Sequence, residues 1–362
     1  MYKNELKAIR HANLFRKREI YDDDLIDLAS NDYLGFSQDK KLFKKAYKRV
    51  LNYPTLSPKA SMLINGYHQI HKEFEESLSF ANQFEQAIVV GSGFLANLAL
   101  IDTLARRGDL LILDEYYHAS GVFASKNSLA KVKFFKHNDP DDLRAILKNS
   151  SYKRAIVAVE GVYSMEADIL NREIFAVVDE FGALLIVDEA HSSGIIGKNL
   201  LGVFDHYSIT PTQNHIKMGT LGKAYGSYGA YILASNHVVE FLQNRAKSII
   251  YATAPSVFDI ALGLEAFKKI IKKRDILSKK IKNRIKLVDD ILDTSIDSLI
   301  LKLEVASSNE ALRIKELFLK KGFLIAAIRA PTVKKPILRI ILRTNIKREI
   351  LKNFLQEIKL EI

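Results

Sequence analysis

Cysteine is absent from this chain of 362 residues. Without a thiol the protein can form no disulfide, no thiolate metal site and no cysteine nucleophile, and such a composition fits a reducing compartment. No apolar run approaches the ~18 residues of a membrane-spanning helix, and the charged segment over residues 1–18 lacks the apolar stretch of a signal peptide. Internal repeats and low-complexity segments are also missing. These absences predict a soluble, cytoplasmic protein that does not contact a membrane.

Basic residues outnumber acidic ones: 54 Lys and Arg stand against 42 Asp and Glu, a formal net charge of +12. Such an excess suits nucleic acid or a polyanionic substrate carrier, for example coenzyme A or an acidic carrier protein. Ten basic residues lie between Lys268 and Lys286. The apolar residues among them recur at helical spacing: Ile270, Leu277, Ile281, Ile285 and Val288. This spacing favours the solvated face of an amphipathic helix. Because no nucleic-acid-binding motif accompanies the charge, we expect no nucleic-acid partner.

Short apolar segments alternate with amphipathic helices from about residue 86. The apolar segments cover residues 87–90, 110–113, 131–135, 155–159, 183–187, 216–218 and 230–234. Continuous apolar strands that alternate with helices predict an α/β fold with a mainly parallel sheet covered on both faces.

The pattern changes after Pro255. Long helices are predicted over residues 256–272 and 275–293, followed by strand-like segments near 299–305, 323–328 and 337–342 with a helix over 308–321. We therefore divide the chain into an N-terminal helix (about 1–18) with its connecting segment (1–45), a large domain (46–255) and a small C-terminal α+β domain (256–362).

Two motifs in the large domain carry chemistry. The segment V-D-E-A-H (Val187 to His191) ends an apolar strand, and G-T-L-G-K-A-Y-G-S-Y-G (Gly219 to Gly229) places Lys223 among glycines. A lysine amine in a small-residue loop can form a Schiff base with an aldehyde, and a buried carboxylate can keep a pyridine nitrogen protonated. The combination predicts a pyridoxal 5'-phosphate (PLP) site that uses Lys223, Asp188 and His191. Taken singly, Asp188 could cap a strand end, His191 could be a core histidine and Lys223 a surface lysine.

Other polar residues follow strands of the same sheet, where open parallel sheets bind their ligands. Gly93 and Phe94 lead into a helix N-terminus that suits a phosphate. His118 could lie over an aromatic cofactor or simply start a helix. Ser164 and Thr220 offer hydroxyls at two more strand ends, where either could cap a turn.

Nine segments resemble, in the same order along the chain, motifs of the α-oxoamine synthases, PLP-dependent enzymes with the fold-type-I aminotransferase architecture. They are N-D-Y-L-G (31–35), G-Y-H-x-x-H (66–71), G-S-G-F-x-A-N (91–97), H-A-S (118–120), E-G-V-Y-S-M (160–165), V-D-E-A-H (187–191), G-T-L-G-K (219–223), Y-A-T (251–253) and I-R-A-P-T-V (328–333). The resemblance implies an α/β fold-type-I PLP transferase with a seven-stranded sheet.

The resemblance also implies roles for individual residues. Lys223 would hold PLP and act as acid and base, Asp188 would pair with the pyridine nitrogen, and His118 would stack on the ring. His191 and Ser164 would bind near the ring hydroxyl. Gly93, Phe94 and Thr220 would hold the phosphate, joined by Thr253 from a second subunit of a homodimer. Contacts to the substrate are implied for four residues: Arg16, Asn31, Thr332 and Arg339. No metal is expected.

The reaction implied is the condensation of an amino acid with an acyl thioester, with loss of CO2. The A-P-T-V segment favours the branch of biotin synthesis, which joins L-alanine to a pimeloyl thioester of coenzyme A or acyl carrier protein. Glycine-using sister enzymes, glycine C-acetyltransferase and 5-aminolevulinate synthase, remain alternatives, as does a PLP aminotransferase; a non-catalytic partner subunit would lack Lys223. Two segments depart from the family pattern: K-A-S-M (59–62) has no arginine, and M-E-A-D (165–168) replaces the more usual M-D-G-D.

Overall fold

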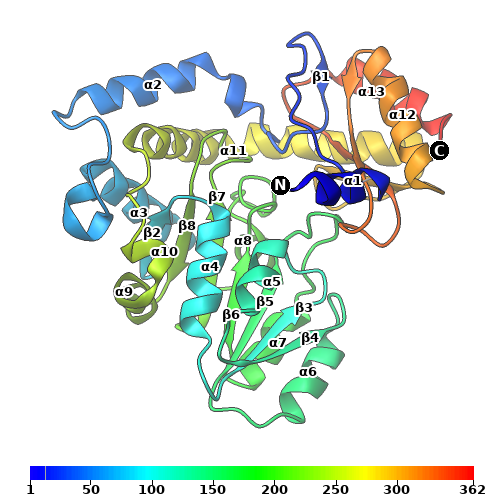
Figure 1. The fold of residues 1–362 in the computed structure, drawn as a ribbon. Helices are drawn as coiled ribbons and strands as arrows, with labels where there is room; N and C mark the ends of the chain where they lie inside the picture. Colours follow the sequence, from blue (N-terminus) through cyan, green and yellow to red (C-terminus); the bar gives the residue numbers. More distant parts are fainter. Residues whose placement is uncertain (13) are drawn as a thin grey trace.

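The computed structural model describes residues 1–12 and 14–362. Its largest sheet has seven strands in the order β2-β8-β7-β6-β5-β3-β4 (Figure 1). The strands are β2 (Gln86–Val90), β3 (Leu110–Asp114), β4 (Lys131–Phe135), β5 (Ala155–Glu160), β6 (Leu184–Asp188), β7 (His215–Thr220) and β8 (Ala230–Ala234). Neighbours from β4 to β7 pair in parallel, whereas β8 is antiparallel to both β7 and β2. The predicted mainly parallel, seven-stranded sheet is confirmed.

Helices cover both faces of this sheet, which is why the central strands β3 and β5 are buried along their whole length and are almost entirely apolar. Along β3, Leu111 and Leu113 pack into one core cluster and Leu110 and Ile112 into the other. The helices between the strands are α3 (Gln69–Asn82), α4 (Gly93–Leu104), α5 (Ala119–Ser125), α6 (Pro140–Lys148), α7 (Glu173–Glu180), α8 (Val203–Tyr207), α9 (Asn236–Arg245) and α10 (Lys247–Ile250).

The C-terminal part forms a smaller antiparallel sheet in the order β11-β12-β9. Its strands are β9 (Ile300–Glu304), β11 (Ala326–Ile328) and β12 (Ile337–Ile341), and α12 (Ser308–Lys320) and α13 (Arg348–Lys359) accompany it. The N-terminal segment joins this unit, because β1 (Ile26–Asp27) pairs in parallel with β10 (Phe323–Leu324). The division of the chain at residues 45 and 255 stays a prediction.

One helix, α11 (Val257–Leu292), replaces the two helices predicted over 256–272 and 275–293. No glycine or proline interrupts residues 264–292, and the buried positions Ile270, Leu277 and Ile281 continue one apolar stripe. The helix runs across the molecule and packs on α2 (Lys40–Leu51), on α3 and on α13 (Figure 1).

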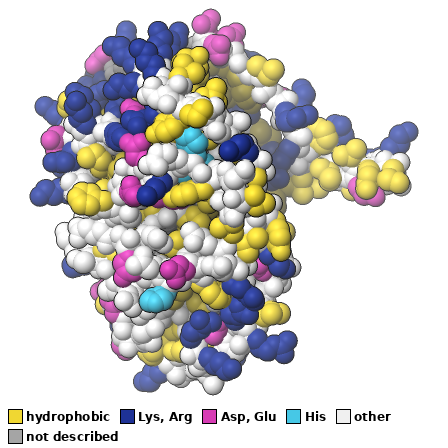
Figure 2. All heavy atoms as spheres, turned by 90° about the vertical axis from the view of Figure 1, so that its left-hand side faces the viewer, with side chains coloured by type: hydrophobic (Ala, Val, Ile, Leu, Met, Phe, Trp, Pro, Cys, Tyr) yellow, Lys and Arg dark blue, Asp and Glu magenta, His cyan; other side chains and the backbone are white. Residues whose placement is uncertain are grey.

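Exposed Lys and Arg side chains gather on the upper part of the face seen from the α2 side (Figure 2). Most of the basic residues of α11 face solvent, as predicted from their spacing. Arg284 is the exception: it is buried and donates a hydrogen bond to the carbonyl oxygen of Ile346.

The N-terminal helix is shorter than predicted. Helix α1 covers Lys3–His11 and buries none of its residues, so no packing favours its extension. Residues 14–18 are not helical, and residue 13 lies outside the described residues. Over the described ranges 1–12 and 14–362, no helix has the combined length and apolarity needed to cross a membrane.

Candidate active site

A cavity of about 190 Å³ lies at the carboxyl ends of the parallel strands. Seven of the thirteen predicted site residues line it: Gly93, Phe94, His118, Asp188, His191, Thr220 and Lys223. They come from segments up to 130 residues apart, because the carboxyl ends of parallel strands meet at one edge of a sheet.

Asp188, the last residue of β6, is held as a carboxylate by two donors. Its Oδ2 accepts a hydrogen bond from Nδ2 of Asn97 (2.9 Å), and its Oδ1 accepts one from the backbone N–H of Ala190 (3.0 Å). Asn97 is oriented in turn by the hydroxyl of Tyr117, which donates to its Oδ1 (2.6 Å). The buried Asp188 therefore presents fixed negative charge to the cavity.

His191 joins Lys223 to Tyr33. Nζ of Lys223 lies 2.6 Å from Nε2 of His191, and the hydroxyl of Tyr33 lies 2.6 Å from Nδ1. Burial and the nearby Lys223 charge lower the pKa of His191 well below its usual value, so the ring is neutral. The ammonium of Lys223 then donates to Nε2, and the ring hydrogen on Nδ1 donates to Tyr33.

Burial lowers the pKa of Lys223 to about 8, against the opposing effect of the Asp188 and Glu160 carboxyl groups. A lysine amine with a pKa near neutrality is unprotonated part of the time, and can act as a nucleophile or as a base.

His118 both starts helix α5 and lines the cavity, so the two roles considered from the sequence coexist. Its Nδ1 accepts a hydrogen bond from the backbone N–H of Ser120 (3.2 Å) and faces the Ser120 hydroxyl at 2.7 Å. Burial lowers the pKa of His118. The ring is therefore neutral, with its hydrogen on Nε2.

The part of the cavity formed by the start of helix α4 suits an anion. Helix α4 begins at Gly93, where its free N–H groups and dipole favour negative charge. A β-carbon added to Gly93 would lie at ordinary contact distance from Met218 (3.7 Å) and Thr220 (3.9 Å), so the Gly93 backbone lies close to both side chains. Phe94 stays 46% exposed at the cavity edge.

Arg339, on β12 of the small sheet, is buried beside two predicted site residues. Its Nε donates to the carbonyl oxygen of Ser164 (2.8 Å), and its Nη1 donates to Oδ1 of Asn31 (2.9 Å). Its Nη2 is buried and has no hydrogen-bond partner within the described part of the chain. A buried guanidinium with a free donor is suited to a carboxylate.

Three further predicted residues lie away from the cavity: Arg16, Thr253 and Thr332 are all exposed and none lines it. Ser164, Asn31 and Arg339 also do not line it. Arg339 joins the other two by hydrogen bonds, and the backbone N–H of Ser164 donates to Oε2 of Glu160 (3.2 Å), which does line the cavity.

Glu160 is a cavity residue that the sequence reasoning did not single out. It ends β5, is buried, and its Oε1 has no hydrogen-bond partner among the described residues. Burial, and then the charge of Asp188, raise the pKa of Glu160 well above its usual value, which favours the protonated form of this carboxyl group. The indication of Glu160 in the sequence is its position as the first residue of the motif E-G-V-Y-S-M. Asn97, likewise, is the last residue of the motif G-S-G-F-x-A-N.

The M-E-A-D departure has a local structural consequence. Glu166 pairs with Lys302 of β9 at 2.5 Å, and Ala167 has a φ of +69°, a left-handed conformation that favours glycine.

Substitution of Ala167 by glycine is expected to stabilise the protein by about 0.5–1 kcal/mol, because relief of left-handed strain exceeds the extra entropy of the unfolded chain. Denaturant-induced unfolding of the two proteins would measure it. The matched control is Ala145→Gly, at an exposed position inside α6, which should destabilise by about 1 kcal/mol. Equal destabilisation in both variants would contradict the expectation.

Comparisons with known proteins identify the family of the chain. A family model described as aminotransferase class I and II matches residues 23–358. An 8-amino-7-oxononanoate synthase of Helicobacter pylori is 45% identical over 361 residues, covering 99% of this chain and 95% of that protein.

Two solved structures share the fold. One, a serine palmitoyltransferase solved with PLP as an internal aldimine, is 22% identical, with a TM-score of 0.90 over 99% of this chain and 97% of the other. The second, an 8-amino-7-oxononanoate synthase of Francisella tularensis, is 27% identical, with a TM-score of 0.78 over 94% and 99% of the two chains. The chain therefore belongs to the aminotransferase class I and II family and groups within it with the 8-amino-7-oxononanoate synthases.

Proposed function

We propose that this protein binds PLP and joins L-alanine to a pimeloyl thioester, releasing CO2 and the thiol carrier and forming 8-amino-7-oxononanoate for biotin synthesis. The observation that carries the proposal is the meeting of Lys223, Asp188 and His118 in one cavity, in a chain that is 45% identical to a synthase of that name. The carrier is coenzyme A or an acyl carrier protein.

The chemistry of the donor set fits PLP. The Lys223 amine suits the aldehyde, the Asp188 carboxylate suits the pyridine nitrogen, and the N-terminus of α4 with Thr220 suits the phosphate. Neutral His118 would lie against the ring, with His191 and Ser164 near its hydroxyl group. When bound, PLP withdraws electrons from the α-carbon of an attached amino acid, so that this carbon can lose a proton and become a nucleophile.

The side chains of this site bind the substrate, orient it and exchange protons with it. Lys223 holds its Nζ against neutral His191, where it can take the α-proton of alanine and later return a proton to the product. Asp188 keeps negative charge at a fixed place through Asn97, so that positive charge opposite it is stabilised without reorganisation. Arg339 binds the alanine carboxylate through its free Nη2, while Asn31 and Ser164 orient the guanidinium. Arg16 and Thr332 are proposed to contact the substrate.

Turnover tests this proposal. Purified protein with PLP and pimeloyl-CoA, supplied with either alanine or glycine, should release thiol with alanine and form a product of the mass of 8-amino-7-oxononanoate. Thiol release with glycine and not with alanine would refute the substrate assignment and leave a glycine-using sister activity. Transfer of the amino group without thiol release would instead indicate an aminotransferase.

Replacement of Arg339 by lysine should raise the KM for alanine about tenfold or more, because a hydrogen bond to a charged group contributes about 1.5–3 kcal/mol. Initial rates at varied alanine and fixed thioester would measure it. Arg343→Lys is the matched control: Arg343 is buried two residues after the end of β12, but its Nη atoms are paired with Asp27 and Asp32. The Arg343→Lys variant should lose stability without a comparable rise in the KM for alanine. A rise in this KM in Arg343→Lys but not in Arg339→Lys would overturn the assignment of Arg339 to the alanine carboxylate.

The active site is proposed to form between two subunits of a homodimer. Thr253 is exposed and remote from its own chain's cavity, which leaves it free to reach the phosphate in a partner's site. Beside it, the segments 61–67 and 250–255 lie together through the Ser61 hydroxyl, which donates to the Ile250 carbonyl, and expose apolar side chains: Leu63, Ile64, Tyr67 and Tyr251.

Light scattering should therefore give a mass about twice the 41.0 kDa of one chain. Substitution of Ile64 by aspartate should shift the protein towards the monomer and lower its turnover. A wild-type protein that is monomeric at assay concentration and fully active would contradict the shared site.

A further inference from the structure

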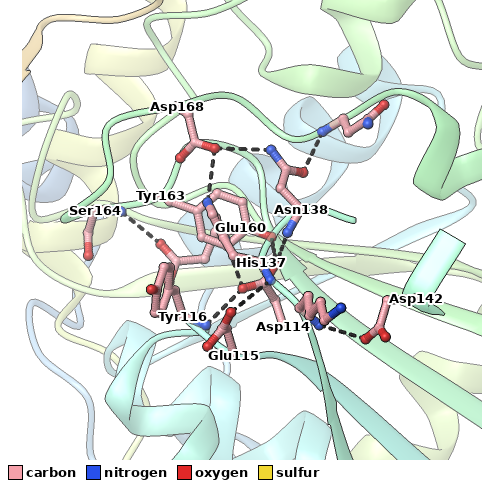
Figure 3. A network of polar contacts seen from close by, with 12 residues as sticks. Asp114, Glu115, Tyr116, His137, Asn138, Asp142, Glu160, Tyr163, Ser164 and Asp168 are labelled. Carbon is pink, nitrogen blue, oxygen red and sulfur yellow. Dashed lines mark hydrogen bonds and ion pairs between the residues drawn. The ribbon is translucent and has the colours of Figure 1, made fainter. Parts of the chain in front are cut away.

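A network of polar side chains lies at the carboxyl ends of β3, β4 and β5, with His137 at its centre (Figure 3). His137 follows the end of β4 by two residues. Its Nδ1 lies 3.0 Å from Oδ1 of Asp114, and its Nε2 lies 3.0 Å from Oδ2 of Asp168. Carboxylates only accept hydrogen bonds, so both ring nitrogens carry a hydrogen and the ring is an imidazolium.

The charge on His137 is stable at neutral pH. Burial lowers its pKa, but the hydrogen bonds and charges of Asp114 and Asp168 outweigh burial and raise the pKa to about 10. The ring is also packed on both sides, with the Tyr163 ring at 4.4 Å and the Tyr116 ring at 4.8 Å between centroids. His137 is therefore a partly buried cation held by two carboxylates and two aromatic neighbours.

Each carboxylate belongs to a turn that carries a site residue. Asp114 begins the turn to His118: its Oδ1 accepts from the backbone N–H of Tyr116 (2.8 Å), and its carbonyl oxygen accepts from that of Tyr117 (3.0 Å). Asp168 closes the turn around Ser164, since its carbonyl oxygen accepts from the backbone N–H of Tyr163 (3.0 Å).

Two neighbours of His137 fasten the same turns. The backbone N–H of Asn138 donates to Oδ2 of Asp114 (2.8 Å), and its side-chain Nδ2 donates to the carbonyl oxygen of Ile169 (2.8 Å). The Tyr163 hydroxyl also donates to Oδ2 of Asp114 (2.8 Å). The two turns are thus connected to each other chiefly through residues that contact or adjoin His137.

We propose that His137 is a positioning residue of the site: by bridging Asp114 and Asp168 it holds the turn that carries His118 and the turn that carries Ser164 in one fixed arrangement. This inference rests on the proposed function, in which His118 faces the cofactor and Arg339, whose Nε donates to the Ser164 carbonyl, binds the amino-acid carboxylate. Loss of the bridge displaces both groups together.

The network also reaches the segment that contains Thr332. Lys334 donates to the Tyr116 hydroxyl (3.0 Å) and lies 3.4 Å from a carboxylate oxygen of Glu115. Because Tyr116 packs on His137, the arrangement of this segment depends on the same ring.

The test compares His137→Phe with His215→Phe. Phenylalanine at 137 keeps the packing against Tyr116 and Tyr163 but removes both hydrogen bonds and the charge. His215 is the matched control, because it is a buried histidine packed against Phe175 and Phe204 at the far, amino-terminal end of β7. In the apoprotein, hydrogen exchange of backbone amides in residues 115–120 and 163–171 should rise about tenfold or more in His137→Phe, and should stay at the wild-type rate in the control.

In the PLP-loaded protein, His137→Phe should lower kcat about 10–100-fold and raise the KM for alanine several-fold, since misplacement by about 1 Å costs on this scale. Asp168→Asn weakens one end of the bridge by removing its negative charge at a half-exposed side chain, so it provides a folded variant if His137→Phe does not fold. It should raise exchange in residues 163–171 and raise the alanine KM.

Wild-type exchange in both turns together with wild-type kcat and KM, in variants that only melt earlier, would overturn the proposal. A wild-type protein that does not consume the thioester would refute the proposed function, whereas the exchange measurement on the apoprotein would still decide the role of His137.

Discussion

Replacement of Lys223 by alanine is expected to lower kcat by on the order of 10⁴-fold or more, since the variant loses both the nucleophile and the acid–base group of the site. Burial lowers the pKa of Lys223 to about 8, and its Nζ is aimed by the neutral His191 at 2.6 Å. No other lysine lines the cavity within the described residues. The variant should also lose the visible absorbance of a lysine-bound cofactor, measured after dialysis against PLP-free buffer.

The control for this prediction is Lys223→Arg. A guanidinium keeps a positive charge opposite His191, but it stays protonated and does not react with an aldehyde. The same loss of turnover in both variants would assign the effect to the amine rather than to its charge. An unchanged absorbance in the dialysed alanine variant would count against Lys223 as the residue that holds the cofactor.

Replacement of Asp188 by asparagine should lower kcat about 10²–10³-fold, or about 3–4 kcal/mol in transition-state free energy. The side chain keeps its size, and one amide oxygen can still accept from Asn97 or Ala190. What it loses is the negative charge that keeps a pyridine nitrogen protonated. Steady-state rates measure the loss of catalysis, and PLP content measures the loss of cofactor binding. We expect kcat to fall far more than PLP content.

Glu160→Gln is the matched contrast, because the surroundings of this second carboxyl group of the cavity favour its neutral form. Burial and the Asp188 charge raise the pKa of Glu160 well above its usual value, so glutamine reproduces its protonated form. The loss of kcat should be much smaller than in Asp188→Asn. Equal losses in the two variants would show that the negative charge of Asp188 is not what matters.

Local sequence patterns predicted the helices and strands that are stabilised by neighbouring residues in the chain or by burial on both faces of the sheet. The strand predicted over residues 110–113 is β3. Helix α6 begins at a local signal of the same kind: Asp139 accepts from the backbone N–H groups of residues 141 and 142, and Pro140 lies in the first turn. The helix over 1–18 was wrong, because an amphipathic sequence forms a long helix only where its apolar face packs, and α1 buries no residue.

For the site, too, the sequence predicted some residues and missed others. Lys223, Asp188, His191 and His118 could be identified because each follows a strand of a parallel sheet or lies in a glycine-rich loop, and such strand ends converge on one edge. Their roles as catalytic and cofactor-binding residues remain predictions. Glu160 and Asn97 stood inside recognised motifs, but their burial and partners follow no spacing rule.

The sequence by itself determined the class of fold, the PLP-type group of lysine, aspartate and histidine, and the family, because strand periodicity and motif order are properties of neighbouring residues. The tertiary structure alone decided that Arg339 lies beside Asn31 and Ser164, that the pKa of Glu160 is raised, and that His137 bridges two carboxylates. These contacts join residues from 23 to 308 positions apart, and the burial that sets their charge exists only once the chain has folded.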